Sequence, residues 1–189
     1  MADQGPASQG RLPLVVGISG ASGAALAQRT IERLGQAGQP LILTITDPGL
    51  RVWKEELGVS FKQSVAGWQE RFLVEVLDVR NIGASIASGS YATRGMIVVP
   101  CSTDALAAIA HGHAANLLER AADVTLKEGR RLVLVPRETP LSAIHLENML
   151  TLARLGVRIV PPMPAFYLRP TTVAEVVEAL VDRILQALE

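Results

Sequence analysis

Three glycines spaced three residues apart, at positions 17, 20 and 23, follow an apolar run and lead straight into the helix-forming segment 24–34. Strand, tight turn of small residues and helix together make an anion site, because the backbone can approach a phosphate and the helix start faces it. Ser19 and Ser22 add hydroxyl groups. The spacing matches neither the dinucleotide fingerprint nor the P-loop motif. The turn therefore predicts either a phosphate site or simply close packing of a strand against a helix.

Beyond this turn, short apolar runs alternate with segments of helical periodicity. Strands are expected at 12–16, 41–45, 72–79, 96–99, 132–135 and 157–160, and helices at 24–34, 50–57, 104–110, 115–127, 142–155 and 173–188. The segment 58–70 is ambiguous, and 81–94 reads as a loop rich in Ser, Gly and Ala. Strands that alternate with helices predict one doubly wound α/β domain, whose parallel sheet is covered by helices on both faces.

The charge balance and the cysteine count narrow the possible partners. The net charge is zero, with 18 residues of each sign, which gives no argument for nucleic acid or an anionic membrane. The single cysteine, Cys101, excludes an intramolecular disulfide and fits a reducing cytoplasm. Residues 1–11 are polar and predict a flexible tail rather than a signal peptide, which leaves 12–189 as the folded domain. Because an uncharged, hydrophobic chain is poorly protected against association, we expect a homo-oligomer.

Polar residues follow several of the expected strands. They are Ser19 with Ser22, Thr46 with Asp47, Ser102 with Thr103, and Arg137 with Glu138. Since open parallel sheets bind ligands beyond the carboxyl ends of their strands, these residues are expected to converge in one crevice. Arg137 either clamps a phosphate or carboxylate there or pairs with Glu138 in the wall.

Three further cations have both a functional and a structural explanation. Arg120 and Lys127 lie seven residues apart on one expected helix and therefore share a face. They either bind an anion or lie in solvent beside Glu119 and Glu128. Arg183 lies at the edge of an apolar helical stripe, with no carboxylate at pairing distance on its own helix. It snorkels, pairs with another element or holds an anion.

The remaining reactive side chains carry weaker signals. Tyr167 lies on a loop between two prolines and either covers a flat ligand, with its hydroxyl near a phosphate, or simply packs. For Cys101, a small buried hydrophobe is favoured over a nucleophile. His111, His113 and His145 lack metal-ligand spacing, so no metal site is expected. Without a G-x-S-x-G motif after a strand, a Ser-His-Asp hydrolase is unsupported.

Several motifs then occur together and in order: Gly17-Ile18-Ser19-Gly20-Ala21-Ser22-Gly23-Ala24, Pro100-Cys101-Ser102-Thr103, Glu119-Arg120-Ala121-Ala122-Asp123-Val124, Leu126-Lys127-Glu128, Pro136-Arg137-Glu138-Thr139-Pro140 and Pro164-Ala165-Phe166-Tyr167. Over residues 12–188 this combination resembles the flavin prenyltransferases, the UbiX-like group. The resemblance implies a Rossmann-like (flavodoxin-like) fold, usually a dodecamer, with FMN bound between subunits. It also implies metal-independent transfer of a dimethylallyl group from dimethylallyl phosphate to N5 and C6 of reduced FMN. The product, prenylated FMN, would serve a UbiD-type decarboxylase.

By matched position, the resemblance also implies the ligand contacts. FMN would be held by Gly20, Ala21, Ser22, Thr46, Ser102, Thr103, Asp104, Ala105 and Arg137. Dimethylallyl phosphate would be surrounded by Arg120, Lys127, Arg137, Glu138, Tyr167 and Arg183. Glu56 corresponds to the family's catalytic glutamate, an acid or base near the reacting edge of the flavin, and Ser22 and Glu138 complete the catalytic set. Fixed cations around a departing phosphate are the physical core of such a reaction.

The chain departs from the family pattern beside the flavin. Thr46-Asp47-Pro48 stands where the family usually has Ser-Lys-Ala, and Asp104-Ala105 replaces a small residue and a hydroxyl-bearing one. The added acids motivate one alternative, a non-catalytic flavin-binding or carrier protein. A second alternative is an FMN-dependent cysteine decarboxylase-like enzyme of the same fold. Those enzymes carry an Asn-bearing loop and a Pro-x-Met-Asn motif where this chain has residues 100–105 and 136–140.

Overall fold

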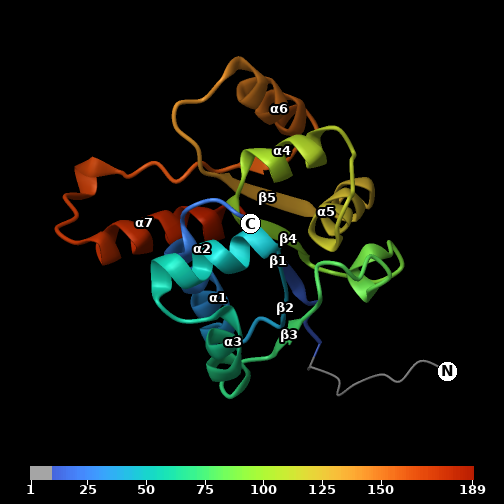
Figure 1. Cartoon of the computed structure of the whole chain (residues 1–189), viewed down its shortest axis with the longest axis horizontal. Coiled ribbons are helices and arrows are strands. Elements are labelled where there is room, and N and C mark those ends of the chain that lie inside the picture. The colour runs from blue at the N-terminus through green and yellow to red at the C-terminus, as the bar shows by residue number, and fades with distance from the viewer. Residues whose placement is uncertain (1–9) are drawn as a thin grey trace.

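The computed structural model describes residues 10–189, and the first nine residues of the expected tail lie outside them (Figure 1). Six parallel strands form one sheet in the order β3-β2-β1-β4-β5-β6. Their bounds are β1 Leu14–Ile18, β2 Leu41–Ile45, β3 Val74–Val76, β4 Gly95–Cys101, β5 Arg131–Pro136 and β6 Arg158–Ile159. The order reverses between β1 and β4, which makes their carboxyl ends the switch point where such sheets bind ligands. The predicted doubly wound α/β fold is confirmed.

Helices cover both faces of the sheet, as expected. One face packs against α1 (Ala24–Gln36), α2 (Asp47–Leu57), α3 (Phe61–Gln69) and α7 (Val173–Gln186), and the other against α4 (Thr103–Ala110), α5 (Leu117–Lys127) and α6 (Ala143–Arg154). Neighbouring strand residues separate accordingly: Val16 belongs to the first core and Val15 to the second. A strand buried on both faces must be apolar throughout, which explains why the central strands read as continuous hydrophobic runs.

The ambiguous segment 58–70 contains helix α3. Ser60 begins it with a capping box, in which the Ser60 hydroxyl accepts from the Gln63 N–H and the Gln63 side chain accepts from the Ser60 N–H. Phe61 and Trp68 then pack edge-on against Trp53 of α2, with ring centroids 5.1 and 5.8 Å from that of Trp53. The local apolar pattern is short, so the helix depends on this tertiary aromatic cluster.

The two outer strands are shorter than the sequence predicts. β3 covers only Val74–Val76 of the expected 72–79, and β6 only Arg158–Ile159 of the expected 157–160. Each has a sheet neighbour on one side alone, and Leu73 and Val76 are exposed. Hydrophobic runs overestimate edge strands because a run there need not be paired along its whole length.

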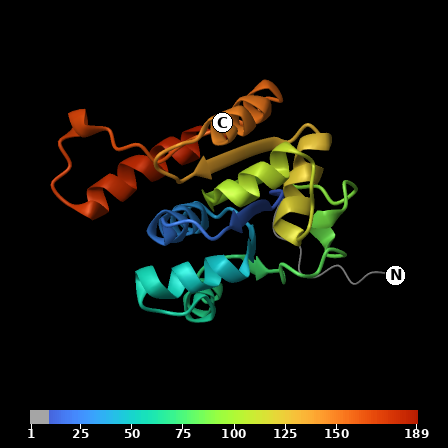
Figure 2. The same cartoon turned by 45° about the horizontal axis from the view of Figure 1, so that its top comes forward.

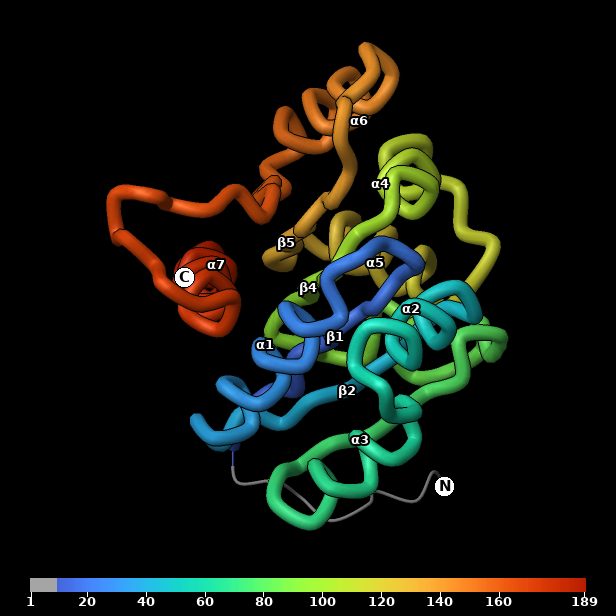
Figure 3. The backbone as a smooth tube through the Cα atoms, turned by 60° about the vertical axis from the view of Figure 1, so that its left-hand side comes forward, coloured from blue at the N-terminus to red at the C-terminus, as the bar shows by residue number. Residues whose placement is uncertain are grey.

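Helix α7 follows residues 160–172, which loop away from the sheet after β6, contain a short 3₁₀ turn at Phe166–Leu168 and are called the arm below (Figure 3). Ion pairs fasten α7 to α1. Arg33 lies 3.0 Å from both Glu178 and Asp182, and Arg29 also pairs with Glu178. The hydrogen bond from Arg29 holds the pKa of the Glu178 carboxyl below its ordinary value.

Replacing Arg33 with Ala is expected to lower the free energy of unfolding by about 1 kcal/mol at low ionic strength, because two partly exposed carboxylates lose their shared partner. The difference should shrink in salt, since partly exposed ion pairs are screened. Urea unfolding at two salt concentrations measures both values. Arg51→Ala is the control, since Arg51 is an exposed α2 residue with no ion pair among the described residues. A loss that is the same at high salt would contradict a charge-based contact.

Candidate functional site

The carboxyl ends of the central strands are joined by backbone hydrogen bonds. The Thr46 N–H donates to Ile18 O at 3.0 Å, the Ser19 N–H to Pro100 O at 3.2 Å, and the Arg137 N–H to Cys101 O at 3.1 Å. These bonds link the ends of β2, β1, β4 and β5 in sheet order. The polar residues after these strands are therefore neighbours, as predicted, and they form what we call the strand-tip site.

Ser19 has a structural role within this site. Its side chain is 2% exposed, donates to Pro100 O at 2.9 Å and accepts from the Ser102 N–H at 2.7 Å. The interpretation of Ser19 as a hydroxyl donor for a ligand is wrong, because its proton is already used. Its bonds hold the glycine turn against the start of α4.

The N–H groups at the start of α1 meet a carboxylate of the chain itself. Glu56, near the end of α2, accepts from the Gly23 N–H at 3.0 and 3.2 Å and from the Ala24 N–H at 2.8 Å. The anion at this helix start is therefore a side chain, whereas the sequence left a phosphate and a merely tight turn as alternatives.

The same contacts set the protonation state of Glu56. Its partial burial pushes the pKa of the carboxyl up, but the Ser22 hydroxyl, the Gly23 and Ala24 N–H groups and the charge of Arg137 outweigh that effect. The net result is a pKa below the ordinary value. Glu56 is therefore ionised at neutral pH and can accept a proton.

Two helices begin at the strand-tip site, and each is capped by a hydroxyl side chain. Thr46 caps α2 by accepting from the Gly49 N–H at 3.2 Å, and Ser102 caps α4 by accepting from the Ala105 N–H at 3.2 Å. Neither hydroxyl donates a hydrogen bond within residues 10–189, so both protons are available for a ligand.

The acid that departs from the family pattern at position 47 has a cation beside it. The carboxylate of Asp47 lies 3.6 Å from the Arg80 guanidinium, which is also 3.6 Å from Asp78. Sequence reasoning missed Arg80, because 33 positions separate it from Asp47 and no local pattern connects them. Asp104 lies exposed in the first turn of α4 and makes no ion pair within residues 10–189.

Arg137 lies at the centre of this group. Its Nε donates to Ser22 O at 3.3 Å, and its terminal nitrogens make no hydrogen bond within residues 10–189. Glu138 is exposed and accepts from the Thr139 N–H at 2.9 Å. The alternative of a structural Arg137–Glu138 pair is wrong, and the planar guanidinium keeps donors free for an anionic or carbonyl ligand.

Arg120 and Lys127 lie on α5, as predicted. Arg120 Nη1 pairs with Asp123 at 2.7 Å and its Nε donates to Ala87 O at 3.2 Å, while Lys127 pairs with Glu128. The companion residue Glu119 is 6% exposed, and its carboxylate accepts from Ala115 and Asn116. The alternative in which Arg120 and Lys127 lie in solvent beside Glu119 and Glu128 is therefore wrong for Glu119, which is buried.

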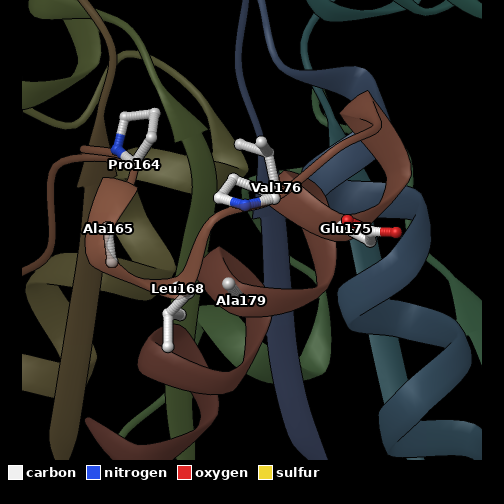
Figure 4. Close-up of a pocket in the computed structure, with 7 residues that line it drawn as sticks. Pro164, Ala165, Leu168, Glu175, Val176 and Ala179 are labelled. Atoms are coloured by element: carbon white, nitrogen blue, oxygen red, sulfur yellow. The ribbon is translucent and has the colours of Figure 1, made fainter.

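Tyr167 and Arg183 lie on the arm and on α7. Tyr167 is 83% exposed, and exposed Arg183 donates to Gln186 at 2.7 Å. A hollow of about 290 Å³ separates the arm from the first turns of α7 (Figure 4), and it is lined by Pro164, Ala165, Leu168, Pro170, Glu175, Val176 and Ala179. Tyr167 does not line this hollow and therefore makes no packing contact there.

One copy of the chain does not gather all the predicted site residues. The strand-tip site brings together the glycine turn, Glu56, Thr46, Ser102 and Arg137. Figures 1 and 2 show α5 on one side of the molecule and the arm with α7 on the opposite side. The cations of α5 and the residues of the arm are therefore separate surfaces of a single chain.

Residues 10–189 contain neither a membrane-spanning helix nor a cluster of metal-binding side chains. No helix there is both long enough and apolar enough to cross a lipid bilayer. No three His, Cys, Asp or Glu side chains gather there in a way that could hold a metal ion.

Comparisons with known proteins agree with the geometry. The Flavoprotein family model matches residues 4–189. A flavin prenyltransferase UbiX from Halalkalibacterium halodurans is 46% identical over 178 residues, which cover 92% of this chain and 86% of that protein. The crystal structure of AnUbiX (PadA1) in complex with FMN and dimethylallyl pyrophosphate superposes with a TM-score of 0.89 at 39% identity, covering 94% of this chain and 92% of the other.

A dodecameric FMN-dependent UbiX-like decarboxylase from Escherichia coli O157:H7 gives a TM-score of 0.87 at 45% identity, with 93% of each chain covered. The FMN-dependent cysteine decarboxylase TvaF is similar in fold alone, with a TM-score of 0.67 at 15% identity over 95% of this chain and 99% of the other.

Proposed function

The chain belongs to the flavoprotein family and, within it, to the UbiX-like flavin prenyltransferases, and on this premise we propose the role of each site residue in the reaction. The enzyme joins the dimethylallyl group of dimethylallyl phosphate to N5 and C6 of reduced FMN. The product, prenylated FMN, serves a UbiD-type decarboxylase as recipient. The proposal rests on one arrangement at the carboxyl ends of β1, β2, β4 and β5. The ionised Glu56 lies beside Arg137 there, and the hydroxyl groups of Thr46 and Ser102 have protons available for a ligand.

These residues fit a flavin. The isoalloxazine ring offers carbonyl oxygens and ring nitrogens as acceptors, and the protons of Thr46 and Ser102 and the free nitrogens of Arg137 are matching donors. Gly20 keeps the turn close to α2, because a Cβ there would overlap the Cβ of Pro48. Ala21, Ser22, Thr103, Asp104 and Ala105 complete the proposed FMN contacts. Bound reduced FMN supplies the nucleophilic nitrogen and carbon that take the allyl group.

Glu56 is proposed as the base of the reaction. The transfer would break the allylic C–O bond, with its electron pair leaving on the phosphate. Each of the two new bonds would replace one proton of the flavin, and the second would also consume the allyl double bond, whose remaining carbon would take up a proton. Forming those bonds releases protons, and an ionised carboxylate can accept one. Glu138, exposed beside Arg137, is the second proposed proton carrier, and Ser22 assists by donating to Glu56.

Arg120, Lys127, Tyr167 and Arg183 are proposed to hold the phosphate together with Arg137. Cations that are fixed around a departing dianion lower the barrier most when water is excluded. Since these residues lie on separate surfaces of one chain, we propose that different copies of the chain complete each site.

The exposed apolar residues of α6 and the arm support this assembly. They are Ile144, Leu146, Leu150, Leu155, Met163, Phe166 and Leu168, each at least half exposed. Apolar surface of this extent marks a protein–protein contact. Together with the 45% identity to a dodecameric structure, it supports an assembly of twelve copies in which the arm of one copy reaches the strand-tip site of another.

The buried Cys101 thiol supports a reducing, cytoplasmic location.

The two alternatives are not favoured. The relatives at 39–46% identity include a flavin prenyltransferase and a structure bound to FMN and dimethylallyl pyrophosphate, whereas the cysteine decarboxylase shares the fold alone. Of the two acids that motivated a non-catalytic carrier, Asp47 is paired with Arg80 and Asp104 is exposed to solvent.

Anaerobic incubation with reduced FMN and dimethylallyl phosphate, followed by mass spectrometry of the released flavin, tests the proposal. We expect a mass gain of one C5 unit on the flavin. Bound FMN without an adduct would instead support the carrier. CO2 release in a parallel incubation with oxidised FMN and a peptide that ends in cysteine would support the decarboxylase.

A further inference from the structure

Arg130 lies between α5 and β5, and its guanidinium faces the loop that precedes β4. Its Nη2 donates to Gly89 O at 2.7 Å, and its Nη1 donates to Tyr91 O at 2.9 Å and to Thr93 Oγ1 at 3.4 Å. Within residues 10–189, no carboxylate lies within 4.0 Å of it. Arg130 is half-buried, and its guanidinium donates to backbone carbonyls that are distant in the sequence. These contacts hold the loop in place.

The loop that Arg130 holds, residues 87–93, also contacts both α5 cations, and we call it the clamped loop. Arg120 Nε donates to Ala87 O at its start. At Gly89 the loop comes so close to α5 that a Cβ would lie 2.7 Å from Lys127 Nζ and would overlap the Glu128 carboxylate. The clamped loop is therefore one wall of the surface that presents Arg120 and Lys127.

We propose that Arg130 is a positioning residue for prenyl-phosphate binding, because it fixes the clamped loop against the last turn of α5 and so sets where Lys127 and Arg120 can lie. This inference rests on the proposed function, in which those two cations bind the phosphate. Arg130 itself does not contact the phosphate, since its terminal nitrogens are occupied by Gly89 and Tyr91. Its effect on the substrate passes through the loop.

Arg130→Ala removes both carbonyl contacts, and we expect the KM for dimethylallyl phosphate to rise about tenfold while the Kd for FMN stays unchanged. Arg130→Lys can hold one carbonyl and should raise the KM about threefold. Hydrogen exchange of the 88–93 amides should quicken in the Ala variant. Loss of structure alone would lower FMN affinity as well, so the separation of the two constants identifies positioning.

Arg131→Ala is the matched control, because Arg131 is the next residue and carries the same charge. Among residues 10–189, its side chain donates only to Glu189 O at 3.3 Å. We expect its KM and its loop exchange to match wild type. If Arg130→Ala fails to fold, the Lys variant carries the test. Wild-type turnover with an unchanged KM in the Arg130 variants would overturn this inference alone. A wild-type protein that forms no adduct would overturn the proposed function and this inference with it.

Discussion

Glu56→Gln is expected to keep FMN bound while slowing adduct formation by at least about tenfold. The amide still fills the space beside the Gly23 and Ala24 N–H groups, but it cannot take up a proton. Removing a positioned general base typically costs a factor of 10²–10⁴, so tenfold is a lower bound. Single-turnover kinetics with bound reduced FMN measures the rate, and flavin fluorescence measures the binding.

Glu55→Gln is the matched control, since Glu55 is the exposed neighbour on α2 and its side chain makes no hydrogen bond within residues 10–189. It loses the same charge one position away and should leave the rate unchanged. Turnover at the wild-type rate in Glu56→Gln would remove Glu56 from the mechanism.

The same pair of variants reports on protein stability. The pKa of Glu56 lies below its ordinary value of 4.5, so its contacts stabilise the fold above that pH, and this contribution disappears as pH falls through the lowered pKa. Wild type should therefore lose stability in acid more steeply than Glu56→Gln. Glu55→Gln should follow wild type over the same range.

The fold could be predicted from sequence because its central elements carry their own signals. Continuous apolar runs identified β1, β2, β4 and β5, whereas α2 begins at Asp47, three residues before the expected start at residue 50. α3 was missed because its short apolar pattern depends on packing against Trp53. Edge strands were overestimated because hydrophobicity does not show where pairing ends.

The sequence predicted which side chains lie at the ends of neighbouring strands, but not which groups they contact. The rule for parallel sheets brought Ser102 and Arg137 together correctly, since strand ends are fixed by topology. The sequence could not show which acceptor each donor binds. The Glu56 carboxylate, for example, reaches the Gly23 N–H only when α2 is packed against α1. The sequence also does not show that the Ser19 hydroxyl donates to Pro100 O within the fold.

Gly20→Ala is expected to weaken FMN binding about tenfold, through a steric effect on α2. The added Cβ would overlap the Cβ of Pro48, in the first turn of that helix. Overpacking of this kind costs about 1–3 kcal/mol, and 1.4 kcal/mol corresponds to a factor of ten. Thr46 lies at the start of α2 and Glu56 lies near its end, so one displacement of the helix would move the proposed flavin donor and the proposed catalytic base together.

Two further variants isolate this cause. Gly67→Ala adds a methyl group in open space on α3, so it should leave FMN binding unchanged and raise stability by up to about 1 kcal/mol through helix propensity. Pro48→Gly in the Gly20→Ala background removes the overlapping atom and should restore most of the FMN affinity. Fluorescence titration measures the FMN affinity of wild type, of the two single variants and of the double variant. Wild-type affinity in Gly20→Ala, or no recovery in the double variant, would show that close packing between the glycine turn and α2 does not govern flavin binding.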